Sequence, residues 1–452
     1  MKNRIYTDIV VIGSGCAGLY CALHLPTDRR VLIITKREAD KSDSYLAQGG
    51  ICVLTEDSDY DSFYGDTLKA GHMENDTRSV ELMIRSSQNV IGDLTSYGVS
   101  FQKDENGRPV YTKEGGHSRE RILYHKDITG KEITGCLHEQ VKKRSNITIL
   151  ENMMLCDLFA EDNVCHGILA ADENGLSCEI HSEFTILATG GIGGLFQHST
   201  NYRHLTGDGI AVALKHGVEL KDEHYIQIHP TTFYTTQAQS RSFLLSESLR
   251  GEGARLYDRN GKRFVSELLP RDLLTKAILL QMEKDGTKYV WEDLTGIGEK
   301  NLKEHFPNIM EYCEKMGYDV TKDWIPVVPA QHYYMGGIRV DHESRTSMEA
   351  LYAIGETACN GVHGKNRLAS NSLLESLVFA KRAALDITAR SKTSFHPIHR
   401  SEYHSDYIDL KKLECRNKQL VLEAIKKKQS AEKRTDEYFK RNEEEQCLIQ
   451  SQ

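Results

Sequence analysis

The stretch DIVVIGSGCAG, residues 8–18, decides how the N-terminal part of this 452-residue chain folds. Its first half is a run of β-branched residues, which is typical of a strand buried on both faces. Its second half has the spacing G-x-G-x-x-G, and an apolar helix from about Leu19 to Leu25 and a second apolar strand, residues 31–35, follow it. We therefore predict a βαβ unit with the glycine loop between its first strand and its helix.

The three glycines of this loop have separate roles. Gly13 permits a sharp turn, Gly15 lets backbone N–H groups approach a pyrophosphate, and Gly18 lets the helix and the strand pack closely. A phosphate at the helix N-terminus would meet unsatisfied N–H groups and a partial positive charge. The second strand ends in the sequence TKRE, without an acid placed to bind a ribose. We therefore assign the contact with the adenosine part of a dinucleotide to Lys36, with Glu38 as the alternative.

The composition excludes several classes of partner. A net charge of −8 offers no basic field for nucleic acid or for an anionic membrane. The sequence has no run of about 20 apolar residues, so we expect no membrane span. The short apolar stretch at the N-terminus does not have the pattern of a signal peptide, which predicts a cytoplasmic protein. Eleven cysteines are scattered without a C-x-x-C pair, so we predict no metal site.

Further along the chain, two more strand–glycine signals extend the first domain. Residues 184–189 are apolar and run into the glycine-rich segment 190–194, which predicts a close approach of the backbone to a ligand. Another such signal lies at 351–356. We interpret residues 40–180 as helical stretches and turns, and the more polar segment from 222 to 338 as an inserted domain. Past residue 393, apolar residues from Leu410 to Ile425 keep a helical period, which predicts an amphipathic helix.

Several motifs resemble, in the same order, those of the flavoproteins related to succinate dehydrogenase, fumarate reductase and L-aspartate oxidase. They are SDSYLAQGG (42–50), ATGG (188–191), TGDG (206–209), QIHPT (227–231), LRGEGA (249–254), PRD (270–272), HYYMGG (332–337), GE (355–356) and HGKNRLASNSLLE (363–375). The resemblance implies an α/β fold with a Rossmann-like FAD-binding domain, residues 1–222 and 339–392. An α+β capping domain, residues 223–338, would interrupt it, and a short helical C-terminal region, residues 393–452, would follow.

The same resemblance implies a set of FAD contacts. Ser372 and Leu373 would present backbone to the flavin ring, Glu356 would lie on the flavin side, and Asp208 would lie near the cofactor. The full predicted set is Gly13, Ser14, Gly15, Cys16, Ala17, Gly18, Lys36, Ser44, Ala47, Gln48, Gly49, Gly50, Ala188, Thr189, Gly190, Gly191, Asp208, Glu356, Ser372 and Leu373.

The substrate implied by the resemblance is a small dicarboxylate. Arg367 would hold one carboxylate, because its planar guanidinium suits a bidentate contact, and His229 and His332 would donate hydrogen bonds. Ser246 stands where the family usually has threonine and keeps the hydroxyl group. Further predicted substrate contacts are Gln227 and Ser370.

Arg271, in the PRD motif, would be the proton-transfer residue of this family. A guanidinium is almost always protonated, so its neutral form needs desolvation and nearby positive charge. Arg367 and the two histidines could supply that charge, offset by Glu247 or Asp272. Two roles therefore stay open for Arg271, which are transfer of the proton and stabilisation of charge.

Two positions separate the subfamilies. Asp43 occupies the place where the membrane-complex enzymes link FAD covalently through a histidine, which predicts a non-covalent flavin. The segment EGGHSRERI, residues 114–122, resembles the EGGHS-x-x-RI segment typical of aspartate oxidases. Glu114 would pair with the ammonium group of an amino-acid substrate, which distinguishes L-aspartate from succinate by charge.

The resemblance therefore implies oxidation of L-aspartate to iminoaspartate, with O2, giving H2O2, or fumarate as electron acceptor. It also implies functional coupling to quinolinate synthase in the synthesis of NAD. A soluble fumarate reductase or a succinate dehydrogenase-type flavoprotein is the alternative function.

Overall fold

A five-stranded parallel sheet forms the centre of the computed structural model, which describes residues 3–237, 241–390 and 407–450. Its strand order is β17-β10-β2-β3-β6. The strands span Leu351–Ala353, Phe184–Leu187, Ile9–Ile12, Val31–Ile34 and Ile147–Leu150 respectively. Helix α1 (Cys16–His24) connects β2 to β3, so the βαβ unit that the sequence predicts is present and its helix begins within the glycine loop.

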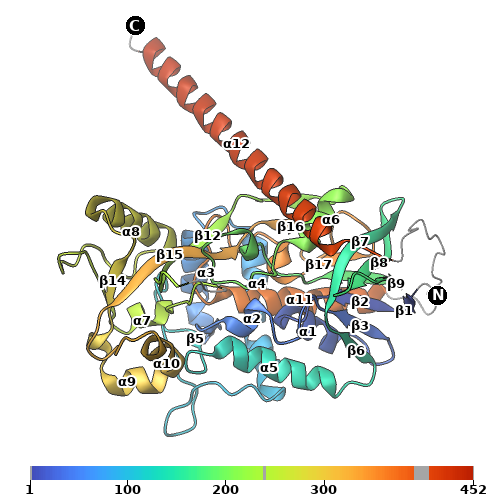
Figure 1. Cartoon of the computed structure of the whole chain (residues 1–452), viewed down its shortest axis with the longest axis horizontal. Helices are drawn as coiled ribbons and strands as arrows, with labels where there is room; N and C mark the ends of the chain where they lie inside the picture. The colour runs from blue at the N-terminus through green and yellow to red at the C-terminus, as the bar shows by residue number, and fades with distance from the viewer. Residues whose placement is uncertain (1–2, 238–240, 391–406, 451–452) are drawn as a thin grey trace.

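Side chains of β2 alternate between two separate cores. Ile9 and Val11 belong to one core and Val10 and Ile12 to the other, and all four are buried. Helices cover the first core, as Figure 1 shows, whereas a second sheet covers the other face. The helices are α1, α3 (Tyr60–Ala70), α4 (Thr77–Ser96), α5 (Thr129–Lys142) and α11 (Asn371–Arg390). Burial on both faces explains why this strand is apolar throughout.

The second sheet was not predicted. It has the order β1-β9-β8-β7, and its strands span Asn3–Tyr6, Ser177–His181, Val164–Asp172 and Met153–Glu161. From the sequence we expected helices and turns over residues 40–180, which include β7, β8 and most of β9. Strand β8 reads VCHGILAAD, and its glycine and alanines weaken the β signal. Pairing with β7 and β9 stabilises the strand despite this composition.

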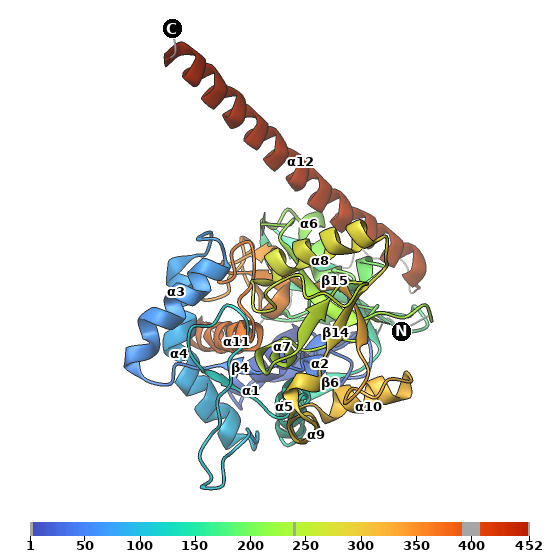
Figure 2. The same ribbon diagram turned by 90° about the vertical axis from the view of Figure 1, so that its left-hand side faces the viewer.

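The inserted segment forms an antiparallel sheet of order β12-β15-β14-β13 with a core of its own. These strands span Ile226–Phe233, Ile325–Tyr334, Val290–Asp293 and Arg255–Tyr257. The accompanying helices are α7 (Glu247–Gly251), α8 (Arg271–Asp285), α9 (Glu299–His305) and α10 (Pro307–Lys315). Figure 2 shows α7, α8, α9 and α10 gathered around this sheet.

A three-stranded sheet lies where the chain leaves and re-enters the first domain. Strand β16 (Gly337–Arg339) pairs with β11 (Leu220–Lys221) and with β18 (Ala358–Cys359). The predicted boundary between residues 338 and 339 would cut β16. We therefore propose that the capping domain ends before Gly337.

The C-terminal region is longer than a short amphipathic helix. Helix α12 (Leu410–Gln450) is continuous, and Figure 1 shows its far part projecting from the body. Its first part packs against α6 (Asp208–Lys215), where Val421 and Ile425 are buried, so the predicted helical period is present. Residues 393–406 of the predicted C-terminal region lie outside the described residues. Within the described ranges, no helix has the length and apolar character needed to span a membrane.

Two glycines, which have no side chain, allow the glycine loop, β2 and α1 to pack closely. A Cβ on Gly13, whose φ is +123°, would lie 2.0 Å from the carbonyl oxygen of Ala188 at the end of β10. A Cβ on Gly18 would lie 2.1 Å from the carbonyl oxygen of Gly13. Because both obstacles are backbone atoms, they cannot move aside as a flexible side chain could. The close packing that the sequence predicts for Gly18 is present.

We expect Gly18→Ala to destabilise the protein although alanine is the better helix former. The helical propensity gained is at most about 1 kcal/mol, whereas overpacking costs about 1–3 kcal/mol. Gly135 in α5 is a matched control, because a Cβ there would meet no atom within 4 Å. Urea unfolding should show a lower midpoint for Gly18→Ala and an unchanged or higher one for Gly135→Ala. Equal midpoints for the two variants would contradict the close packing at Gly18.

Candidate active site

One cavity of about 1610 Å³, including its part open to solvent, joins the glycine loop to the capping domain. Most of the predicted site residues line it. They are Gly13, Ser14, Gly15, Cys16, Ala17, Lys36, Ser44, Ala47, Gln48, Gly49, Gly50, Glu114, Ala188, Thr189, Gly190, Asp208, His229, Ser246, Arg271, His332, Glu356, Arg367, Ser370, Ser372 and Leu373.

Three predicted residues do not line this cavity. Gly18 packs against the glycine loop, and Gly191 packs against Glu356, whose carboxylate would lie 2.2 Å from an added Cβ. Gln227 lies behind the two arginines, where it donates to the carbonyl oxygen of Arg367 (2.8 Å) and accepts from Arg271 (2.9 Å). Gln227 therefore positions the arginines.

The glycines after β10 serve packing more than ligand contact. Gly190 lines the cavity, but a Cβ on Gly193 would lie 2.0 Å from the side chain of Asn201. A Cβ on Gly194 would lie 2.3 Å from the carbonyl oxygen of Arg203. Of the glycines in this segment, Gly190 alone lines the cavity, so the approach of the backbone to a ligand stays a prediction for Gly190.

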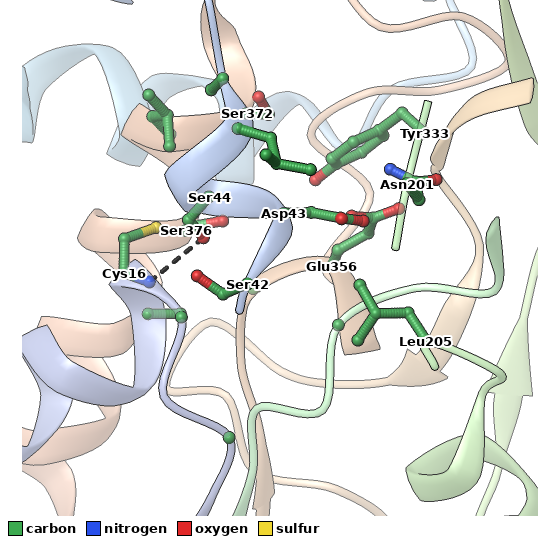
Figure 3. Close-up of a pocket in the computed structure, with 18 of the residues that line it drawn as sticks. Cys16, Ser42, Asp43, Ser44, Asn201, Leu205, Tyr333, Glu356, Ser372 and Ser376 are labelled. Carbon is green, nitrogen blue, oxygen red and sulfur yellow. Dashed lines mark hydrogen bonds between the residues drawn. The ribbon is translucent and has the colours of Figure 1, made fainter. Parts of the chain in front are cut away.

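Lys36 is held by protein groups at the nucleotide end of the cavity. Its ammonium group donates to Asp208 at 2.7 Å and to the carbonyl oxygen of His204 at 3.0 Å. Glu414 of α12 lies 3.7 Å away. The predicted adenosine contact would therefore have to share a lysine whose charge is already balanced by Asp208. At the glycine loop, the backbone N–H of Cys16 donates to Ser44 at 3.1 Å (Figure 3).

Three buried polar atoms on residues that line the cavity have no hydrogen-bond partner in the part of the chain that the structure describes. They are Ser42 Oγ, Asp43 Oδ2 and Gln48 Oε1. Figure 3 shows the side chains of Asp43 and Glu356 extending toward the same part of the cavity. Burial raises the pKa of Asp43 to about 7, and burial together with Asp43 raises that of Glu356 to about 8. Glu356 is therefore mostly protonated at neutral pH and can donate a hydrogen bond. This polar lining beside a glycine loop fits FAD.

Two buried arginines lie at the other end of the cavity. Arg271 begins α8 and donates to Glu247 at 2.6 Å, so its charge is balanced. Arg367 lies over the ring of Tyr333, with its guanidinium carbon 4.5 Å from the ring centroid. Its Nε has no hydrogen-bond partner among the described residues. Burial lowers the pKa of Arg367 to about 10, so the group remains charged at neutral pH. An anion bound in the cavity would therefore stabilise the charged form of Arg367 more than that of Arg271.

The counter-charge of Arg271 is Glu247, one of the two acids that the sequence left open. Burial alone would raise the pKa of Glu247, but Arg271 and Arg250 lower it, which keeps the carboxylate ionised. The other candidate, Asp272, lies 2.9 Å from His72 instead. Glu247 also lines the cavity, although sequence analysis named it only as a counter-charge. Its place directly after Ser246 was the available signal.

His229 and His332 are neutral and lie close together. Their ring centroids are 5.1 Å apart, and both rings line the cavity. Burial and the nearby Arg271 lower the pKa of both residues well below the usual range. His332 is held by Thr200 at 2.8 Å, and His229 by the backbone of Thr231, while the buried Nε2 of His229 has no partner among the residues described. That nitrogen is available to a ligand.

Glu114 joins the two domains at the wall of the cavity. It accepts a hydrogen bond from Ser370 of the first domain at 2.6 Å and from Ser248 of α7 at 2.7 Å. Burial, followed by the charge of Glu247, raises its pKa. A carboxylate has about four lone-pair sites, so two serines leave room for another donor. A cationic group in the cavity could occupy those sites.

Comparison with known proteins identifies the family. A family model described as an FAD binding domain matches residues 8–373. The L-aspartate oxidase of Clostridium perfringens (strain 13 / Type A) is 49% identical over 382 residues, which are 84% of this chain and 87% of that protein. The L-aspartate oxidase of Clostridium acetobutylicum is 50% identical over 384 residues, 85% of this chain and 88% of that protein.

A solved structure shows the same fold. The quinol fumarate reductase of E. coli matches with a TM-score of 0.82 at 28% identity, covering 88% of this chain and 72% of that chain. The identities to the two oxidases are much higher and extend over most of each protein. The chain therefore belongs to the L-aspartate oxidase family of FAD-dependent oxidoreductases.

Proposed function

We propose that this chain oxidises L-aspartate to iminoaspartate in the cavity between the FAD-binding and capping domains. The observation that carries the proposal is a buried carboxylate, Glu114, in the same cavity as two buried arginines. A substrate with one ammonium and two carboxylate groups matches this set of charges. FAD, when bound, supplies the acceptor for the hydride that leaves Cα.

The arginines would bind the carboxylates of the substrate. Arg367 has an unpartnered Nε, and its planar guanidinium suits a bidentate contact. His229 would contribute its free Nε2. Removal of water strengthens these contacts. A capping domain that closes over the substrate would exclude water and would therefore also protect the imine from hydrolysis.

Glu114 would bind the ammonium group and so select an amino acid over succinate. Charge pairing in a buried site is strong, and an unpaired buried charge is costly. Each oxygen of the Glu114 carboxylate accepts a hydrogen bond from one serine, so the carboxylate is fixed before the substrate arrives. This arrangement favours substrates whose amine reaches the cavity wall.

The reaction removes two electrons and two protons from L-aspartate. The hydride leaves Cα, and a proton leaves the nitrogen. Arg271 donates hydrogen bonds to Glu247 and Gln227, which supports a charged guanidinium that stabilises developing negative charge. Of the two roles left open for Arg271, we therefore favour charge stabilisation. Because the pKa values of His229 and His332 lie well below the usual range, their neutral rings suit hydrogen bonding to the substrate better than retention of a proton.

We further propose O2, giving H2O2, or fumarate as electron acceptor, and delivery of iminoaspartate to quinolinate synthase for the synthesis of NAD. The family relationship supports this proposal. The ten described cysteines are free thiols, which supports a reducing compartment such as the cytoplasm.

The activity is tested with the purified yellow protein. We expect anaerobic L-aspartate to bleach the flavin absorbance, and we expect aerobic L-aspartate to give H2O2. Succinate at the same concentration is the control and should do neither. Flavin that stays oxidised in anaerobic L-aspartate would contradict the proposed function, and bleaching by succinate alone would favour a succinate dehydrogenase-type reaction.

The role of Glu114 predicts a selective loss in Glu114→Gln. Removing one partner of a buried charge pair costs about 3–5 kcal/mol, so kcat/KM for L-aspartate should fall by about 10²- to 4 × 10³-fold. The inhibition constant of succinate, which has no amine, should change little. Steady-state kinetics with succinate as competitive inhibitor gives both values. A similar loss for both ligands would show that Glu114 does not recognise the amine.

We also propose that FAD is bound without a covalent link, because Asp43 lines the cavity where related enzymes carry the linking histidine. Acid precipitation of the protein should therefore leave the yellow colour in the supernatant. Free FAD added to a control protein fixes the recovery of the procedure. Colour that stays in the pellet would contradict the proposal.

A further inference from the structure

A buried ion cluster lies behind the cavity and has no part in the chemistry proposed above. Arg121, which is fully buried, donates to both oxygens of Asp59 at 2.9 and 3.0 Å and to Asp66 at 2.7 Å. It also donates to Nδ1 of His117 at 3.0 Å. Neither Arg121 nor His117 lines the cavity. Burying a charged arginine is costly, so its arrangement needs an explanation.

The contact with Arg121 fixes the tautomer of His117. A guanidinium has no acceptor, so Nδ1 of His117 must offer its lone pair. A neutral imidazole then carries its proton on Nε2, which donates to the carbonyl oxygen of Ala369 at 3.0 Å. Burial, followed by the charge of Arg121, lowers the pKa of His117 to about 4, so the ring is neutral at physiological pH. The direction of the hydrogen bonds from Arg121 to His117 and from His117 to Ala369 is therefore determined.

His117 holds both sides of the Glu114–Ser370 contact. Its backbone N–H donates to the carbonyl oxygen of Glu114 at 3.2 Å, and its ring binds the carbonyl oxygen of Ala369. Ser370, the next residue, has a left-handed backbone with φ of +60°, which is uncommon for serine. The hydroxyl of Ser370 accepts from the N–H of Gly50 at 3.2 Å and donates to Glu114. A turn in this conformation needs support from its neighbours.

We propose that His117, locked in its Nε2–H tautomer by Arg121, is a positioning residue that sets the Glu114 carboxylate for the amine of the substrate. The inference rests on the proposed function. His117 acts through the turn at Ala369 and Ser370 and does not touch the substrate. It would be a determinant of the preference for an amino acid over an amine-free dicarboxylate, because the carboxylate-binding arginines lie outside its contacts.

Two substitutions separate the hydrogen bonds of His117. The short side chain of His117→Asn can still accept from Arg121 but cannot reach Ala369. The longer His117→Gln can place an N–H near the position of Nε2 and keep the bond to Ala369. Ser118→Ala is a matched control, because Ser118 bonds Asp66 and Arg121 in the same cluster without contacting the turn.

We expect His117→Asn to lower kcat/KM for L-aspartate about tenfold, as for a misplaced hydrogen bond to a charged group. The inhibition constant of succinate should stay within about twofold in the same variant. His117→Gln and Ser118→Ala should resemble the wild type in both values. In a Glu114→Gln background, His117→Asn should add less than about twofold, because the two residues act on one interaction. Bound flavin per protein and the thermal midpoint are measured for every variant.

Several outcomes would overturn the inference. A rise in the succinate constant equal to the loss for L-aspartate would show a merely structural role, as would equal losses in His117→Asn and His117→Gln. Independent, multiplying losses in the double variant would show that His117 does not act through Glu114. If His117→Asn fails to retain flavin, ¹⁵N shifts of histidine-labelled wild-type protein test the tautomer, with His117→Gln used for assignment. A proton on Nδ1 would overturn the inference.

The wild-type assay separates this inference from the proposed function. A wild-type protein that does not oxidise L-aspartate would contradict the proposed function itself. If the wild type oxidises L-aspartate and His117→Asn weakens L-aspartate and succinate equally, only the role of His117 is contradicted.

Discussion

The burial of the central parallel sheet on both faces is the constraint on which the site depends. Because β2 and its neighbours are covered by helices on one side and by a second sheet on the other, polar ligands can approach only at the strand ends. The loops after β2 and β10 meet at one such end, where Gly13 lies against Ala188. The capping domain then covers the same end, which produces a cavity walled by both domains.

The charges of the cavity follow from this burial. The carboxyl groups of Asp43 and Glu356, which extend toward the same part of the cavity, have raised pKa values and so bring less negative charge to that part. At the other end, Arg271 is balanced by Glu247, whereas Arg367 has an aromatic neighbour in Tyr333. Because the two arginines are paired unequally, an anion bound beside Arg367 would become part of the charge balance of the folded protein.

Local sequence patterns predicted those parts of the structure that depend on residues close together in the chain. The apolar run determines strand β2, and the spacing of Gly13 and Gly18 determines the glycine loop. The strand and the loop were both predicted from the sequence. Lys36 was predicted to contact the adenosine part because its strand ends without an acid, whereas its protein partner, Asp208, lies 172 residues away and no local signal links the two. Gly193 shows a further limit, because a glycine that avoids a side chain of the protein looks the same in sequence as one that approaches a ligand. The serines that hold Glu114 lie 134 and 256 residues from it, so only the fold could reveal them.

The position of Glu114 between Ser248 and Ser370 has a thermodynamic consequence. Each serine belongs to a different domain, so the free energy of these two hydrogen bonds depends on how the domains are oriented. A ligand that binds this carboxylate more tightly in one domain orientation would shift the protein toward that orientation. By linkage, that orientation would bind the ligand more tightly by the same factor. Recognition of a single charged group and the orientation of the two domains would then be one equilibrium.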